Sequence, residues 1–193
     1  QSILQNQVER FGRHMFKEGS MVIPGQIAYS GKVHSIQLAS NFAGETLVPS
    51  AYYNATTPVV ITGATSGVQA KVIGFADATA TTQPRLVIQY INTGSDNQTE
   101  SFADGENLTA DVSITHTTTY AAQIASATTF SSGAAQIGSA VKIQEGVFYV
   151  KGQFVRNAEQ TLYLDYTTRN VSARVGFQVT ETLETPETDA SLT

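Results

Sequence analysis

The sequence predicts a mainly β protein that begins with one helix. Near the C-terminus, apolar residues recur at every second position, which is the period of a half-buried strand. In the middle of the chain, short apolar runs alternate with turns that contain glycine or proline, as in small antiparallel barrels and sandwiches. Near the N-terminus the apolar spacing becomes three and four, as in an amphipathic helix. We therefore expect an N-terminal helix, small antiparallel β-barrel or sandwich domains, and a β-meander.

Shifts in composition divide the 193 residues into five segments. The expected order is an N-terminal helix at 1–18, connecting strands and loops at 19–57, a β-domain at 58–110, a Thr/Ala/Ser-rich strand and arm at 111–140, and a β-meander with an acidic polar tail at 141–193. A chain of this length can bury a sizeable core. Because it starts at Gln1 and ends in the polar tail, we expect a fragment or the ordered part of something longer.

The N-terminal helix carries an apolar seam. Its members are Leu4, Val8, Phe11 and Met15, spaced four, three and four residues apart like the a and d positions of a coiled coil. Either the helix packs on its own domain, or it bundles with identical helices along the axis of an oligomer. A coiled-coil prediction needs three or four heptads, and this seam spans two. Gly12 lowers the helix propensity by about 1 kcal/mol relative to alanine, and Gly19 provides a stop after the helix.

Alternation and turn residues together predict the strands. Those before the meander are Met21–Ser30, Lys32–Leu38, Val59–Thr62, Val68–Ala76 and Arg85–Ile91. The three strands of the meander are Val141–Val155, Thr161–Tyr166 and Arg174–Val179. Pro24 should interrupt the first strand, because proline cannot donate to a strand ladder. Within 111–140 the first part alternates like a strand, and the second part is predicted to be a loop or an extended arm exchanged between subunits.

Composition argues against several functional classes. The net charge of −5 and the scattering of the 11 basic residues argue against nucleic-acid binding, which needs clustered Lys and Arg. The absence of cysteine excludes disulfides and zinc–thiolate sites, so oligomerisation is the first candidate for additional stabilisation. No apolar run approaches the roughly 20 residues of a membrane span. We expect no nucleic-acid partner and no membrane insertion.

No pattern of polar residues indicates catalysis. The histidines are His14, His34 and His116, and no two have the i, i+4 spacing of a helical metal site. Neither an acid pair suited to glycoside hydrolysis nor a nucleophile elbow is visible. The acidic stretch 96–106 either binds a hard cation through its oxygens or forms a solvated hairpin loop, and it lacks the residue order of a calcium loop. We expect no enzyme activity, no catalytic residues, no metal and no cofactor.

Four segments together point to a known family. They are VERFGRHMFKEGSMVIPG, FADGENL, KIQEGVFYVKGQFV and VGFQVTETLETPETDASL. They resemble a family of uncharacterised phage proteins, defined by one shared domain of unassigned function, that occurs in tail-fibre and baseplate-associated virion proteins of tailed bacteriophages. The resemblance covers most of the chain, and in that family the chain usually continues further. It implies a structural component of the phage tail and a homotrimer, since tail fibres and many baseplate attachments are three-fold.

The resemblance leaves three functions to compare. The first is a structural connector that attaches an appendage to the tail, with its own copies and other tail or baseplate proteins as partners. The second is a host-surface glycan-binding module that uses Tyr52 and Tyr53, which lie side by side in a polar loop. A polysaccharide depolymerase ranks last, because no acid pair or β-helix repeat is visible.

Overall fold

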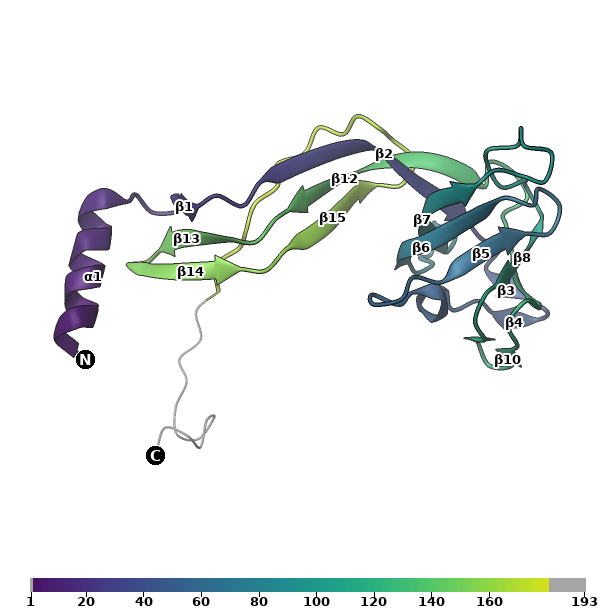
Figure 1. Cartoon of the computed structure of the whole chain (residues 1–193), viewed down its shortest axis with the longest axis horizontal. Coiled ribbons are helices and arrows are strands. Elements are labelled where there is room, and N and C mark those ends of the chain that lie inside the picture. The colour runs from purple at the N-terminus through teal and green to yellow at the C-terminus, as the bar shows by residue number, and fades with distance from the viewer. Residues whose placement is uncertain (1, 181–193) are drawn as a thin grey trace. The chain divides into compact units, whose positions relative to one another are not determined.

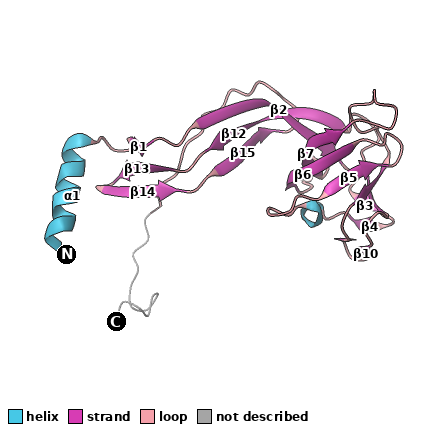
Figure 2. Cartoon of the chain, in the orientation of Figure 1, coloured by secondary structure: helices cyan, strands magenta, loops and turns pink. Residues whose placement is uncertain are grey.

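The structure of the chain is a computed structural model that describes residues 2–180, without the side chains at positions 2–6, 8 and 9. Antiparallel sheets dominate it, and an α-helix stands at the N-terminus (Figure 2). The elements in order are α1 (Ser2–Met15), β1 (Met21–Ile23), β2 (Ile27–Gln37), β3 (Asn41–Phe42), β4 (Glu45–Thr46), the 3-10 helix η1 (Pro49–Tyr52), β5 (Val60–Gly63), β6 (Gln69–Ala76), β7 (Arg85–Asn92), β8 (Asn107–Ala110), β9 (Ile114–Thr115), β10 (Thr119–Tyr120), β11 (Ala125–Thr128), β12 (Ala135–Ile143), β13 (Gly146–Val150), β14 (Gln153–Asn157) and β15 (Gln160–Asp165) (Figure 1). No helix within the described range is long and apolar enough to cross a membrane.

The chain divides into two compact units. The large unit comprises 29–141 and 162–171, and the small unit comprises 1–28, 142–161 and 172–193, described up to residue 180. Strands β2, β12 and β15 carry residues of both units, whereas the three-stranded sheet β1-β13-β14 belongs wholly to the small unit.

The large unit contains the hydrophobic core. Most of its strands belong to an eight-stranded sheet with the order β11-β8-β5-β6-β7-β2-β12-β15, and β3-β4 and β9-β10 form two small two-stranded sheets. Buried residues alternate with more exposed ones along β5 and β6, so one face of this hairpin packs inward. The largest fully buried side chains of the core are Tyr52, Ile36, Leu38, Ile61, Leu86, Ile88 and Leu108. This burial supplies most of the favourable free energy of folding in the large unit.

The small unit is built on the hairpin β13–β14. Its register runs from Gly146 opposite Asn157 to Val150 opposite Gln153. Lys151 and Gly152 close it, with φ angles of 48° and 87°. A two-residue turn with positive φ at both positions matches the twist of the flanking strands, which explains a glycine at this position.

Most of the strands predicted in the first half of the chain are confirmed. The N-terminal helix is α1, and three of the predicted strands correspond to β5, β6 and β7 within one or two residues. Pro24 does interrupt the first predicted strand, so β1 ends at Ile23. The predicted break between Ser30 and Lys32 is wrong, because β2 runs straight through Gly31. At Gly31 a Cβ would lie 3.1 Å from the carbonyl oxygen of Arg169, so this glycine permits a close backbone approach and does not make a turn.

Four other predictions need correction. The eight-stranded sheet stays open, and no closed barrel is detected among the described residues. The continuous first strand of the meander, Val141–Val155, is wrong, because the chain leaves β12 at Ile143 and turns back at Lys151-Gly152. Arg174–Val179 is not paired as a strand in the described structure. The predicted loop or arm in the second part of 111–140 contains β11 and the start of β12, where small residues such as Ala127 and Ala140 are buried.

Candidate assembly surface

Helix α1 packs on the small unit through one row of residues. Gly12 is buried, and a Cβ at this position would lie 2.7 Å from Cε2 of Tyr149. Just beyond the helix, the Phe16 ring centroid lies 5.9 Å from that of Tyr149 and 5.7 Å from that of Phe154. Tyr149 and Phe154 are cross-strand partners, so the helix covers one face of the β13–β14 hairpin. The glycine that weakens the helix is the residue that lets it approach the sheet.

The neighbouring row of α1 is exposed. Phe11 and Met15 are one turn apart on the same side of the helix and are 60% and 63% exposed. They are the described half of the predicted seam, because the side chains of Leu4 and Val8 lie outside the described residues. The helix therefore does pack on its own unit, but through Gly12 and not through this half of the seam.

The small unit buries few large apolar side chains. Those it buries, among its described residues, are Ile143 and Tyr149, whereas the hydrophobic core cluster belongs to the large unit. Its exposed large apolar side chains are Phe11, Met15, Met21, Ile23, Ile27, Phe154, Val155, Phe177 and Val179. Helix α1 covers part of its sheet, yet the described small unit still exposes more large apolar side chains than it buries. Exposed apolar side chains in this proportion are suited to burial in an assembly.

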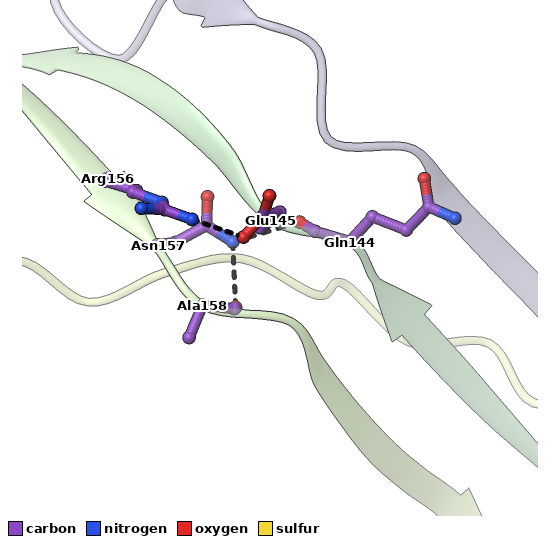
Figure 3. Close-up of polar contacts among 5 residues, drawn as sticks. All are labelled: Gln144, Glu145, Arg156, Asn157 and Ala158. Atoms are coloured by element: carbon purple, nitrogen blue, oxygen red, sulfur yellow. Dashed lines mark hydrogen bonds and ion pairs between the residues drawn. The ribbon is translucent and has the colours of Figure 1, made fainter.

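Strand β14 forms one edge of the small sheet. Its first four residues are exposed, and β13 is its strand partner. Figure 3 shows how its C-terminal end is fastened: Arg156 Nη2 lies 2.7 Å from Oε2 of Glu145, and the Asn157 side-chain amide donates to the carbonyl oxygens of Gln144 and Ala158 at 3.1 Å. The ion pair is largely exposed and contributes little to stability. The contacts tie β14 to the start of β13, and among the described residues its outer edge has no strand partner.

The two adjacent tyrosines lie in different environments. Tyr52 is fully buried, and its hydroxyl donates to Oγ of Ser126 at 2.8 Å. Burial raises the pKa of Tyr52 above its ordinary value. The Tyr53 side chain is 40% exposed, and its ring centroid lies 5.6 Å from that of Phe75. Tyr52 therefore has no surface to offer a partner, and Tyr53 remains the candidate for contact.

The histidines do not come together into one site. His116 lies between two structural partners: the backbone N–H of Val48 donates to Nδ1 at 3.2 Å, and Nε2 is 2.8 Å from the carbonyl oxygen of Ser126. A neutral ring that carries its proton on Nε2 satisfies both contacts. His34 packs edge-on against the Tyr90 ring, and His14 is exposed on α1.

Three carboxylates of the acidic stretch 96–106 accept hydrogen bonds from the protein's own backbone. Asp96 accepts the N–H groups of Thr99 and Gln98 at 2.9 Å, and these hydrogen bonds, that of Thr99 first, lower the pKa of Asp96 to about 2. Asp104 accepts two N–H groups from the loop before β12, which lowers its pKa. Glu106 is buried and accepts three N–H groups and one hydroxyl. In the described part of the chain, no three His, Asp or Glu residues gather where they could hold a metal ion.

The sequence did not single out the row that attaches α1 to its sheet, nor the edge at β14. Gly12 and Phe16 share the i, i+4 spacing of the exposed seam, so a wider apolar arc on the helix was a usable signal. The edge position of β14 had no such signal, because the order of strands in a sheet depends on pairing between distant segments and not on a local sequence pattern.

Comparison with known proteins gives no relative. No protein-family model matches the chain, and no curated protein or solved structure matches it.

Proposed function

We propose that this chain is a structural component of a tailed bacteriophage virion, in the tail fibre or baseplate, where it connects an appendage to the tail through oligomeric assembly. The observation that carries the proposal is the exposed pair Phe11 and Met15 in a unit with little core of its own. The resemblance of the sequence to phage tail proteins provides the setting. In the proposed homotrimer, three α1 helices pack along one axis, with Leu4 and Val8 extending the seam toward the N-terminus.

By magnitude, the helix seam alone is too small to supply the proposed interface. Burying the exposed surface of Phe11 and Met15 contributes roughly 2–4 kcal/mol per copy. Association costs about 4–15 kcal/mol in lost translational and rotational freedom. The helix seam therefore needs help from other exposed apolar residues of the small unit. The proposed interface includes its sheet as well as its helix.

Light scattering on the full chain over a concentration series tests the proposal. We expect the mass of a trimer, and we expect the double variant Phe11→Ser/Met15→Ser to have the mass of a monomer. Arg10→Ser/Arg13→Ser is the matched control, because it places two serines on exposed positions of the same helix outside the seam and should preserve the trimer. A wild-type chain that is monomeric at every concentration, or a seam variant with an unchanged mass, contradicts the proposal.

A second function is favoured by Tyr53. Its side chain is 40% exposed, its ring packs against Phe75, and the polar, uncharged residues Asn54, Thr56 and Thr57 follow it in the sequence. An aromatic ring flanked by hydroxyl and amide groups suits stacking on a sugar. Glycan binding that is lost in Tyr53→Ala and kept in Tyr53→Trp supports this function, and a screen of host-surface glycans with no binding at high concentration removes it.

A further inference from the structure

The segment Arg174–Val179 has the sequence of a strand without a strand partner. Val175, Phe177 and Val179 alternate with more polar residues or glycine, which is the period of a strand with one apolar face. The described structure gives this segment no helix, turn, bend or strand pairing. Its backbone N–H and C=O groups form no hydrogen bond with other described residues. A backbone of this kind is a ready template for pairing with another strand.

One side chain of this segment, Phe177, already packs on the small sheet. The Phe177 ring packs on Phe148, with centroids 5.3 Å apart and the rings nearly perpendicular at 66°. Phe148 belongs to β13, the central strand of the small sheet, so the segment touches the face of its own sheet and not its edge. Phe177 and Val179 are still 42% and 52% exposed. The contact with Phe148 holds the segment without using its backbone.

The same unit has a complementary open edge. The two edges of the small sheet are β1 and β14. Strand β1 has three residues and is followed by Pro24, which lacks an N–H and blunts that edge. Strand β14 has five residues and no proline, and it exposes Phe154 and Val155. Its length nearly matches the six residues of the unpaired segment.

We infer that Arg174–Val179 of one copy adds as a fourth strand to the β14 edge of a second copy. Each copy has one such segment and one such edge, so repetition around a closed ring satisfies both in every copy. The apolar residues of the segment then add to the burial that the helix seam alone does not supply. This inference rests on the proposed assembly but specifies a contact that the helix seam does not require.

Hydrogen exchange at single-residue resolution tests the inference, with the mass of the full chain measured on the same sample. Successive N–H groups of a strand point to opposite sides, so a strand with one partner protects every second amide. We expect alternate amides between Arg174 and Val179 to exchange about 100-fold or more slowly in the oligomer, since exchange then requires the strand to open. The same amides should exchange freely in the monomeric variant Phe11→Ser/Met15→Ser.

The outcomes separate this inference from the proposed function. An oligomer in which all six amides exchange freely overturns the strand pairing and leaves the assembly intact. A chain that is monomeric by mass overturns both, and a monomer with protected amides shows pairing within one chain. Two proline variants, Val175→Pro and Gly176→Pro, give a second test. Because successive N–H groups point to opposite sides, one of the two prolines removes an N–H that is bonded to β14, and that variant should lose protection of the outward-facing amides of β14. The other variant should keep this protection. Two proline variants that both keep this protection also overturn the inference.

Discussion

Replacing Glu106 with glutamine should destabilise the large unit although the two side chains have the same shape. The Glu106 side chain is 3% exposed, and its carboxylate accepts N–H groups from Thr65 and Ser66 at 2.9 Å and from Ala103 at 2.7 Å. The Ser66 hydroxyl donates to it at 2.8 Å. These donors come from the β5–β6 loop and from the segment before β8, so one carboxylate connects two separate stretches of the chain.

The expected loss follows from the donor count. Glutamine has one acceptor oxygen and one NH2 group, and its least costly orientation keeps the oxygen facing the two N–H groups of Thr65 and Ser66. The Ser66 hydroxyl can rotate to accept from the NH2, but the Ala103 N–H then faces another donor. An unsatisfied buried donor costs about 1–3 kcal/mol, and the bonds that remain lose their charge assistance. We expect the free energy of unfolding to fall by roughly 2–4 kcal/mol in total.

Urea unfolding followed by tyrosine fluorescence and circular dichroism measures this loss, since the chain has eight Tyr and no Trp. The midpoint for the large unit should fall by about 1–2 M at the slopes usual for small domains. Glu100→Gln is the matched control, because Glu100 is exposed in the same acidic stretch and should change the midpoint little. If Glu106→Gln unfolds at the same urea concentration as the control, the four hydrogen bonds do not stabilise the fold as argued.

Two further predictions concern the small unit and the acidic stretch. Gly12→Ala should lower the thermal stability of the small unit. A Cβ 2.7 Å from the buried Tyr149 ring costs about 1–3 kcal/mol by overpacking, which outweighs the gain in helix propensity of about 1 kcal/mol. A higher melting temperature in the variant contradicts this. Since the folded pKa of Asp96 is lowered to about 2, its stabilisation is present above about pH 4 and is lost as the pH falls toward 2. Urea midpoints measured from pH 6 to pH 2 should therefore decline less steeply in Asp96→Asn than in wild type, and identical slopes exclude this role for Asp96.

The elements that the sequence predicted well depend on short-range chemistry. The helix and the strands β5, β6 and β7 follow from spacing and from the turns that bound them, because period and turn residues act within a few positions. The role of Glu106 depends on donors about 40 residues earlier in the chain, at Thr65 and Ser66. In the sequence it is one acid among several in a polar loop. The pattern of 96–106 therefore indicated a cation site or a solvated loop, and it contained no sign of a buried anchor.

The errors in the middle of the chain have a different physical cause. The stretch that contains β11 and β12 is rich in small residues, which carry little periodic signal and are equally common in loops. Ala127 is fully buried and Ala140 is nearly so, which places small residues of this stretch in the packed interior. Such positions are selected by the space between elements, and that space exists only once the sheet has formed.

The segment Arg174–Val179 differs from both of these cases, because its strand pattern is clear and the described part of the chain does not pair it as a strand. The seam of α1 behaves in the same way: Phe11 and Met15 have the spacing of an interface and lie exposed. Both features belong to the small unit, whereas the large unit pairs its strands with one another and contains the hydrophobic core. A local pattern is selected by the environment in which the side chains finally rest. Pattern and single-chain structure disagree twice in this one unit, and the proposed assembly with further copies of the chain accounts for both disagreements.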